Sequence, residues 1–388
     1  MIKRASKQNL LRLSKLFSVV SVLGPRQSGK TTLVRMCFPR YRYVNLENPD
    51  LRRQALDDGE AFLKNNPAPL IIDEVQYVPE LLSRIQVIVD EDPKKKGLYV
   101  LTGSHQPRLK EGLSQSLAGR VGILTLLPLS LRELADAGMD AERDDFLFKG
   151  FMPRIWAEGL PPFDCQENYL QTYVDRDVNQ LIHLKDKRAF DVFLRTLAGR
   201  VGQLVNYQSI ANDIGVSMPT IKEWISILEA SYIVHILPCY YRNFGKRFVK
   251  APKVYFTDVG LLTHLLGIRS PEQLARDPLM GGIFENMVIM EAVKSRLNAG
   301  LPDDCYFIRD RSGMEIDLVI ENGRALSLYE IKASMSYSPD FAKNLEKARK
   351  VFPEVNAATV VYAGNAASLQ GIEYTNFKVA FSSKRVRY

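Results

Sequence analysis

The stretch GPRQSGKT, Gly24 to Thr31, matches the spacing G-x-x-x-x-G-K-[ST]. A β-branched run with Val19, Val20 and Val22 precedes it, and the helix-forming run TTLVRMCF follows it. Two glycines let the backbone curl so that its N–H groups face phosphate oxygens, and the helix N-terminus adds a favourable dipole. The sequence therefore predicts a phosphate-binding loop between a strand and a helix.

This loop and a later strand supply the residues that a bound nucleotide needs. Lys30 is expected to reach the β- and γ-phosphates of ATP, and Thr31 is expected to hold Mg²⁺. The run PLIIDE ends in two carboxylates, of which Asp73 is expected in the Mg²⁺ shell and Glu74 beside the attacking water. The predicted nucleotide contacts are Gly24, Pro25, Arg26, Gln27, Ser28, Gly29, Lys30, Thr31, Thr32, Asp73 and Ser104.

Two further features extend this site. LYVLTGS ends in hydroxyls, so Thr102 or Ser104 is expected to sense the γ-phosphate, unless the segment is a plain strand-to-loop turn. Arg120 in SLAGR is a candidate arginine finger presented to a neighbouring subunit, with an ordinary structural arginine as the alternative. Strands that alternate with helices predict a parallel α/β sheet.

The middle of the chain reads as helical. A polar, acidic stretch from Asp136 to Asp145 marks an expected boundary, and a helical segment is expected from Gln166 to Gly199. An apolar stripe at helical spacing predicts a lid over the nucleotide domain, and Arg176 is a candidate contact to nucleotide or to a neighbour. The stripe comprises Tyr169, Tyr173, Val174, Val178 and Leu181.

A winged helix is predicted from Asn206 onward. One helix, Gln208 to Asp213, is expected to end at Gly215, and a second to begin with Ser217 as N-cap. A β-run, YIVHIL, follows, and helix, turn, helix and hairpin together make a winged helix. The expected buried stripe of the second helix is Ile221, Trp224, Ile225 and Leu228.

The loop after this β-run is basic and aromatic. Positive charges beside Tyr240, Tyr241 and Phe244 suit phosphate contacts and base stacking. The predicted DNA contacts are Arg242, Lys246, Arg247 and Lys250, with Lys253 further along the same wing. Winged helices also pack against proteins, so DNA contact and protein–protein contact both stay open.

Near the end of the chain, EIDLVIENGRALSLYEIKA reads as two strands around a tight turn. Asn322-Gly323 is a strong two-residue hairpin signal, and a turn there pairs Asp317 with Leu328. Alternate residues share a face, so the hairpin gathers Glu315, Asp317, Glu330 and Lys332 on one side.

Neighbouring carboxylates repel unless a cation neutralises them. Oxygen ligands suit Mg²⁺ or Mn²⁺, so Asp317 and Glu330 are candidate ligands, and Glu285 from the preceding helix could complete the shell. Lys332 is expected to orient an attacking water or to stabilise the charge on a scissile phosphate. The alternative is a half-exposed hairpin with its charges in water.

Length and composition bound these interpretations. A chain of 388 residues predicts two or three domains, and a net charge of +8 is compatible with nucleic acid without requiring it. The four cysteines form no CxxC pair and the four histidines are scattered, which argues against disulfides and zinc. No apolar run reaches the ~20 residues that span a bilayer. We therefore expect a cytoplasmic protein without a membrane partner.

The motifs GPRQSGKT, LIIDEVQ, LTGS, SLAGR, YVDRDV and PKVYFTDVGLL resemble those of AAA-type predicted ATPases of bacteria and archaea. Members of that family carry a C-terminal domain of unknown function, and the resemblance covers nearly the whole chain. GMEIDLVI and YEIKA resemble the restriction-endonuclease-like fold, in which an Asp is followed by Glu-x-Lys, here Asp317, Glu330 and Lys332. Glu285 matches the acidic residue on that fold's first helix, whereas Ile316 stands where the fold often has proline.

These features predict an α/β protein of several parts. We expect an AAA-type P-loop ATPase domain at 1–145, a helical lid at 146–200, a winged helix at 201–267, a linker at 268–282 and a restriction-endonuclease-like domain at 283–388. The candidate catalytic residues are Lys30, Glu74, Arg120, Asp317, Glu330 and Lys332, and the candidate metal ligands are Thr31, Asp73, Glu285, Asp317 and Glu330.

The expected function is ATP hydrolysis coupled to action on duplex or branched DNA. In it, the last domain cuts or holds DNA with Mg²⁺ or Mn²⁺, and Arg120 supports self-association. The alternative is a nucleotide-controlled switch that binds a protein partner, with a nuclease-like domain that serves for docking.

Overall fold

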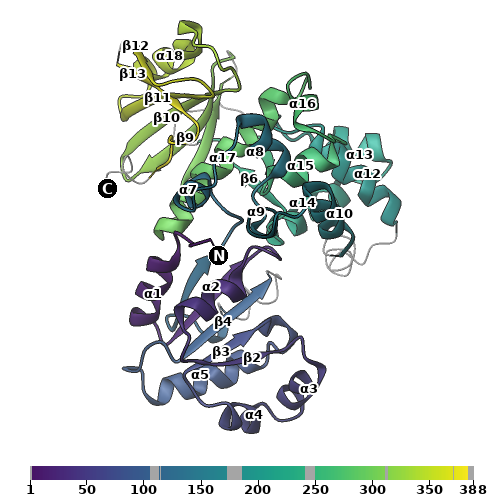
Figure 1. The fold of residues 1–388 in the computed structure, drawn as a ribbon, viewed down its shortest axis with the longest axis vertical. Helices are drawn as coiled ribbons and strands as arrows, with labels where there is room; N and C mark the ends of the chain where they lie inside the picture. The colour runs from purple at the N-terminus through teal and green to yellow at the C-terminus, as the bar shows by residue number, and fades with distance from the viewer. Residues whose placement is uncertain are drawn as a thin grey trace. The chain divides into compact units, whose positions relative to one another are not determined.

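The computed structural model describes residues 2–104, 113, 115–172, 186–240, 250–310, 313–369 and 371–382. The chain forms two compact units (Figure 1). Unit 1 comprises Met1–Leu129 with Ala230–Tyr232 and Leu297–Leu301, and unit 2 comprises Ser130–Glu229, Ile233–Arg296 and Pro302–Tyr388. The division between the units therefore comes at Leu129, before the boundary that the acidic stretch suggested.

Unit 1 is built on a five-stranded parallel sheet, as the sequence predicted. Its strand order is β2-β3-β4-β1-β5. The strands are β1 (Val19–Gly24), β2 (Arg42–Asn45), β3 (Leu70–Asp73), β4 (Tyr99–Ser104) and β5 (Val121–Thr125). The helices are α1 (Lys7–Leu16), α2 (Lys30–Cys37), α3 (Pro49–Asp57), α4 (Gly59–Asn65) and α5 (Leu81–Glu91), with a 3-10 turn, η1 (Val75–Tyr77).

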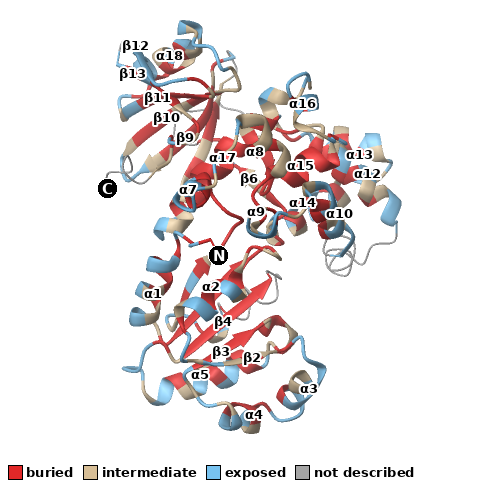
Figure 2. Ribbon diagram, viewed as in Figure 1, coloured by how far each residue is buried: buried red, intermediate tan, exposed pale blue. Residues whose placement is uncertain are grey.

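The central strands of this sheet are buried on both faces (Figure 2). One core cluster gathers α4 and α5 residues with Val19, Ile72 and Leu101, and the other gathers α1 and α2 residues with Val20 and Val100. Parallel strands covered on both faces read as continuous aliphatic runs, which is why the sequence pattern identified them. Their carboxyl ends carry the predicted nucleotide residues to one edge of the sheet.

Unit 2 contains helices and a short strand pair before its large sheet. The helices are α7 (Leu131–Asp136), α8 (Arg143–Lys149), α9 (Pro153–Glu158), α10 (Pro162–Tyr169), α12 (Lys187–Ala198), α13 (Tyr207–Ile214), α14 (Met218–Ala230), α15 (Val259–Leu265), α16 (Pro271–Leu274) and α17 (Met280–Ala299). Strands β6 (Val234–Leu237) and β7 (Lys253–Phe256) pair antiparallel. The expected 268–282 linker contains α16 and the start of α17.

The predicted helix pair is confirmed as α13 and α14. Gly215, with φ +81°, ends α13. Ser217 Oγ accepts a hydrogen bond from Thr220 N at 3.2 Å, as an N-cap does. The buried residues of α14 are the predicted Ile221, Trp224, Ile225 and Leu228. Of the lid stripe, Tyr169 is buried, whereas Tyr173, Val174, Arg176, Val178 and Leu181 lie outside the described residues.

The C-terminal part of unit 2 is a mixed six-stranded sheet with the order β12-β13-β11-β10-β9-β8. The strands are β8 (Cys305–Arg309), β9 (Glu315–Asn322), β10 (Ala325–Lys332), β11 (Val355–Tyr362), β12 (Ala367–Leu369) and β13 (Ile372–Asn376). The turn η4 (Pro339–Ala342) and helix α18 (Lys343–Val351) pack on this sheet and share a core with Val319, Leu326 and Leu328. Both faces of the β9–β10 hairpin are therefore buried along most of its length.

The register predicted for this hairpin is wrong by two residues. Asn322 pairs with Ala325, so Gly323 and Arg324 form the turn in place of Asn322 and Gly323. Gly323 has φ +65°, as the first position of a II′ turn requires. A shift of two keeps every side chain on its predicted face, because the side-chain period is two. Continued one pair beyond Tyr329 and Leu318, this register sets Glu330 directly opposite Asp317.

None of the helices in the described ranges is both long and apolar enough to cross a lipid bilayer.

Candidate nucleotide site and carboxylate cluster

The phosphate-binding loop joins the carboxyl end of β1 to the start of α2. Gly24 has φ +151°, and a Cβ there would lie 2.1 Å from Leu126 O. Gly29, with φ +90°, is the N-cap of α2, and Gln27 also has a positive φ of 60°. Glycine is needed at Gly24 for space and at both glycines for backbone conformation. The loop thus curls ahead of the helix N-terminus, as the motif predicts.

Lys30 lies folded back onto this loop. Its ammonium donates to Gly24 O at 3.0 Å and to Pro25 O at 2.8 Å. Burial lowers the pKa of Lys30 to about 8, although the nearby Glu74 and Asp73 carboxylates act in the opposite direction. Among the described residues, this buried cation donates to carbonyl oxygens alone, so it is well placed to receive an anion.

Asp73 collects hydroxyl groups from three neighbouring elements. Thr31 Oγ1 donates to Asp73 Oδ2 at 2.9 Å, and Tyr43 Oη donates to the same oxygen at 2.7 Å. Thr102 Oγ1 donates to Oδ1. The paired hydroxyl of Thr31 and carboxylate of Asp73 are hard oxygen ligands of the kind that Mg²⁺ prefers.

Glu74 has its own polar neighbours, which differ from those of Asp73. Gln76 Nε2 donates to Glu74 and also to Ser104 Oγ, the latter at 3.1 Å. Ser104 Oγ lies 3.4 Å from Glu74 Oε2. The sequence left Thr102 and Ser104 as alternative sensors of the γ-phosphate. In the structure Thr102 donates to Asp73, whereas Ser104 lies beside Glu74. Sequence reasoning missed Gln76, although it stands two residues after Glu74.

The residues of this loop fit a nucleotide with Mg²⁺. Ser28 Oγ and Gln76 Oε1 are buried and have no hydrogen-bond partner among the described residues, as polar atoms facing a ligand would be. Arg4, which the sequence did not point to, hydrogen-bonds to the backbone of the loop. Its guanidinium donates to Ser28 O at 2.5 Å and to Leu127 O at 2.6 Å.

Arg120 lies away from the nucleotide loop of its own chain. Its carbonyl oxygen accepts from Val19 N, at the amino end of β1, whereas the loop follows the carboxyl end of that strand. Its guanidinium pairs with both oxygens of Asp90, at 2.5 and 2.9 Å. An arginine-finger role within one chain is therefore excluded by position, and a role toward a neighbouring subunit stays a prediction.

The C-terminal carboxylates meet a lysine that comes from β7. Lys253 Nζ lies 3.0 Å from Glu285 Oε1 and 2.7 Å from Glu315 Oε1. Tyr255 Oη donates to the same Glu285 oxygen at 2.5 Å. Lys253 is only 1% exposed, so its expected place on a solvent-facing wing is wrong.

The predicted trio lies beside this contact. Lys332 Nζ donates to Glu330 Oε1 at 2.7 Å and lies 3.9 Å from Asp317 Oδ2. Asp317 Oδ2 accepts from Ile331 N at 2.7 Å. Within the described part of the chain, no group of three or more histidine, cysteine, aspartate or glutamate side chains is arranged to hold a metal ion.

Burial and mutual repulsion govern the charges of this cluster. Burial, followed by the charge of Asp317, raises the pKa of Glu285 and of Glu330. Burial alone would lower the pKa of Lys253, but the carboxylates of Glu285, Asp317 and Glu315 outweigh it and raise that pKa. The lysine is therefore held as a cation by its partners.

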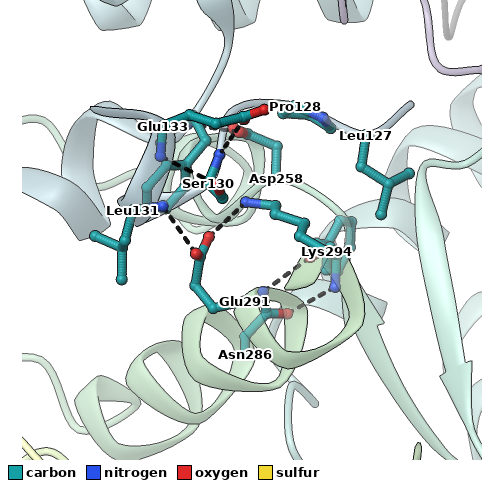
Figure 3. A network of polar contacts seen from close by, with 12 residues as sticks. Leu127, Pro128, Ser130, Leu131, Glu133, Asp258, Asn286, Glu291 and Lys294 are labelled. Atoms are coloured by element: carbon teal, nitrogen blue, oxygen red, sulfur yellow. Dashed lines mark hydrogen bonds and ion pairs between the residues drawn. The ribbon is translucent and has the colours of Figure 1, made fainter. Parts of the chain in front are cut away.

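A network of buried polar contacts fixes α17, which carries Glu285 (Figure 3). Glu291 accepts from Leu131 N at 2.8 Å and from Lys294 Nζ at 2.9 Å. Asn286 accepts from Phe256 N at 2.6 Å and donates to Phe256 O at 2.8 Å. The amide of Asn286 thereby aligns β7 on α17 and brings Lys253 and Tyr255 to Glu285.

The predicted DNA contacts are mostly outside the described residues. Arg242, Lys246 and Arg247 lie in 241–249, and Lys250 is exposed. Tyr240 is buried and packs edge-on against Tyr306, with ring centroids 5.4 Å apart. It is therefore not a surface for base stacking.

Family comparisons agree with this layout. A family model described as an AAA domain matches residues 17–135, and two described as domains of unknown function, DUF8612 and DUF4143, match 140–272 and 280–378. The chain is 30% identical to an uncharacterized protein of Mycobacterium tuberculosis over 378 residues, which covers 93% of this chain and 80% of that one. It belongs to the family of AAA-domain proteins with a C-terminal DUF4143 domain.

Other members and folds are more distant. An uncharacterized protein of Haemophilus influenzae is 24% identical over 322 residues, covering 74% of this chain and 77% of that one. Among solved structures, the Walker-type ATPase of Pyrococcus abyssi aligns with a TM-score of 0.42 and 14% identity, over 67% of this chain and 94% of that one. For RuvB of Thermotoga maritima the TM-score is 0.30 at 20% identity, over 60% and 86%. The AAA–DUF4143 chain thus has a P-loop ATPase fold in unit 1 and a separate mixed sheet at its C-terminus.

Proposed function

We propose that this protein binds ATP with Mg²⁺ and hydrolyses it in unit 1. The observation that carries this proposal is the carboxylate of Asp73, which accepts hydrogen bonds from Thr31, Tyr43 and Thr102 at the carboxyl edge of the sheet. The curled loop and the buried ammonium of Lys30 lie at the same edge. Together they offer donors for phosphate oxygens and hard ligands for the metal.

Each side chain then has a separate task. Thr31 and Asp73 would hold Mg²⁺, which neutralises charge on the phosphates when it is bound. Lys30 exchanges the carbonyls of Gly24 and Pro25 for phosphate oxygens. Glu74 accepts the proton of the attacking water, and Gln76 orients its carboxylate. We assign Arg120 to the nucleotide of a neighbouring subunit, because its own loop is out of reach.

Two substitutions separate binding from chemistry. Lys30→Ala should abolish ATP binding and turnover, because the phosphates lose their cation. Glu74→Gln should keep nucleotide binding and lower kcat by about 10²–10⁴-fold, the usual contribution of a general base. Lys64→Ala, at an exposed lysine of the same unit, is the control. ATP turnover at the wild-type rate in Glu74→Gln would remove Glu74 from the mechanism.

We further propose that the ATPase cycle acts on DNA through a winged helix in unit 2. Support comes from the α13–α14 pair, its N-cap and the following β6–β7 strand pair, which is the element order of that module. Lys222, exposed on α14, and exposed Lys250 supply positive charge beside it.

The C-terminal sheet has two candidate roles in this scheme. Metal-dependent cleavage of DNA requires Glu285, Asp317 and Glu330 to turn their oxygens toward Mg²⁺ or Mn²⁺. The contacts of Lys253 with Glu285 and Glu315 favour the second role, in which a nuclease-like fold serves for docking.

A further inference from the structure

The strongest charged cluster outside the nucleotide loop lies between β7, α17 and the β9–β10 hairpin. It combines four acidic side chains with two lysines from different elements, Lys253 on β7 and Lys332 on β10. The acidic residues are Glu285, Glu315, Asp317 and Glu330. In the restriction-endonuclease-like fold that the sequence resembles, such acids hold a divalent cation. The contacts of these acids decide whether that ion fits this cluster.

One oxygen of each of these carboxylates already has a donor, whereas Glu330 Oε2 is buried without a hydrogen-bond partner among the described residues. Glu285 Oε1 accepts from both Lys253 Nζ and Tyr255 Oη, and Glu315 Oε1 accepts from Lys253 Nζ. Asp317 Oδ2 is used by Ile331 N, and Glu330 Oε1 by Lys332 Nζ. The Lys253 distances of 2.7 and 3.0 Å are those of ammonium hydrogen bonds, whereas Mg²⁺ requires oxygens at about 2.0–2.1 Å. With Lys253 Nζ between Glu285 and Glu315, and no three acidic side chains of the described residues arranged to hold a metal ion, the cluster as arranged does not fit a divalent cation.

The backbone of Lys253 is held on both sides, so its position is built into the fold. It pairs with Leu237 of β6 and forms a bridge with Leu204. Three residues on, the Asn286 amide grips both polar backbone atoms of Phe256. The backbone that carries this ammonium is therefore fixed against β6 and, through Asn286, against α17.

We propose that Lys253 is an internal cation that replaces a divalent metal ion in this cluster and joins β7 to the C-terminal sheet. Its ammonium carries one positive charge into the position between Glu285 and Glu315, and Lys332 neutralises Glu330 and Asp317 from the other side. The cluster is thus a structural ionic joint, without the metal ion that cleavage of DNA would require. The proposal is independent of ATP hydrolysis in unit 1.

Mn²⁺ titration of Lys253→Ala tests this assignment. All proteins carry Asp73→Asn, which removes the proposed carboxylate ligand of the nucleotide-site metal, and bound Mn²⁺ is counted by electron paramagnetic resonance. In proteins that retain Lys253, we expect no bound Mn²⁺ ion whose binding is lost in Glu285→Gln. Without Lys253, the uncovered carboxylates should bind Mn²⁺ more than about tenfold more tightly, equivalent to about 1.4 kcal/mol. Adding Glu285→Gln should abolish that gain, and Lys250→Ala, at the exposed neighbouring lysine, should show none.

Stability gives a second readout. Both tryptophans, Trp156 and Trp224, belong to unit 2, so their fluorescence follows its unfolding. Lys253→Ala should lower the thermal midpoint, and Mn²⁺ should raise it again only in that variant. If Lys253→Ala does not fold, the pair Lys253→Met with Glu285→Gln should fold, because both charges are removed together.

Three results would overturn the proposal. The first is a Mn²⁺ ion bound to the protein with Lys253 intact and lost in Glu285→Gln. The second is a folded Lys253→Ala variant that gains no affinity for Mn²⁺. The third is a Lys253→Met, Glu285→Gln pair that is no more stable than Lys253→Met alone.

Discussion

At Asp73 and at Lys253 a full charge lies almost entirely out of water, with 3% and 1% exposure. Such burial is costly unless hydrogen bonds or opposite charges compensate it. Asp73 accepts hydrogen bonds from three hydroxyl groups, which carry no positive charge. Its negative charge is therefore available to a divalent cation. Lys253 is compensated by the carboxylates of Glu285 and Glu315, which surround it with opposite charge. The same residue types thus make the proposed metal site in unit 1 and the proposed structural joint in unit 2.

The raised carboxyl pKa values predict a pH dependence for unit 2. Glu285 and Glu330 have pKa values of about 7 and about 8 in the folded protein, above the ordinary 4.5. The folded state therefore binds these protons more tightly than the unfolded state does. Their contribution to stability is complete below about pH 4.5 and is lost as pH rises through about 7 to 8, by at most about 1.4 kcal/mol per pH unit and group.

Urea unfolding followed by tryptophan fluorescence from pH 5 to 9 measures this effect. As pH rises, the unfolding free energy of the wild type should fall relative to that of Glu330→Gln. Glu223→Gln, at an exposed carboxylate of the same unit, should track the wild type across this range. A difference that stayed flat would show that Glu330 has an ordinary pKa.

At the scale of elements, the important contact is between β7 and α17. Asn286 satisfies both the N–H and the carbonyl of Phe256, and the adjacent pairing of β6 with β7 fixes the other edge. An asparagine amide can do this because it carries a donor and an acceptor side by side. About one turn further on, Glu291, which also pairs with Lys294, accepts a hydrogen bond from Leu131 N and so ties α17 to the start of α7. Helix and strand together decide which residues face the carboxylates.

Replacement of Asn286 should therefore unfold unit 2 more easily. Asn286→Leu leaves two buried backbone groups of Phe256 without partners, each worth about 1–3 kcal/mol. We expect a loss of about 2–5 kcal/mol in the unfolding free energy of unit 2 by denaturant titration, together with exposure of Lys253 to amine-modifying reagents. Asn344→Ala, at a partly buried asparagine on α18 of the same unit, should cost much less. Equal losses in the two variants would contradict the role of the Asn286 amide.

At the scale of the whole molecule, the nucleotide loop and the predicted DNA-binding module belong to different compact units. ATP turnover can act on DNA only if nucleotide binding or hydrolysis in unit 1 changes the rates of DNA binding or release in unit 2. The basic residues after β6 are the place to perturb this coupling, because they are remote in sequence from every nucleotide contact.

Duplex, single-stranded and branched DNA should each be tested with Mg²⁺ or Mn²⁺, with and without ATP. Lys246→Ala with Arg247→Ala should weaken DNA binding and lower the slope of log K against log salt by about 2. DNA stimulation of ATP turnover should fall in parallel. Lys94→Ala with Lys96→Ala removes the same charge from an exposed part of unit 1 and is the control. Unchanged affinity in the first pair would favour a protein partner instead.

The sequence by itself determined the features that rest on short-range physics. The loop of Gly24 to Thr31 needs glycines at fixed spacing, Asp73 ends a buried aliphatic strand, and Ser217 caps a helix whose buried stripe repeats with helical period. In each case the deciding neighbours lie within a few residues along the chain. The sharing of faces in the β9–β10 hairpin was also predictable, because alternation survives a register shift of two.

Only the tertiary structure decided what long-range packing controls. The hairpin turn moved to Gly323 and Arg324, since the choice between two adjacent turns depends on how the strands pair with the rest of the sheet. Nothing in the local sequence distinguishes Lys253 from an exposed lysine of a wing, but in the structure it is buried against Glu285 and Glu315. A lysine becomes a surface charge or an internal cation according to partners that the fold brings from distant segments. Charge burial is therefore a property of the packed molecule and could not be read from local sequence.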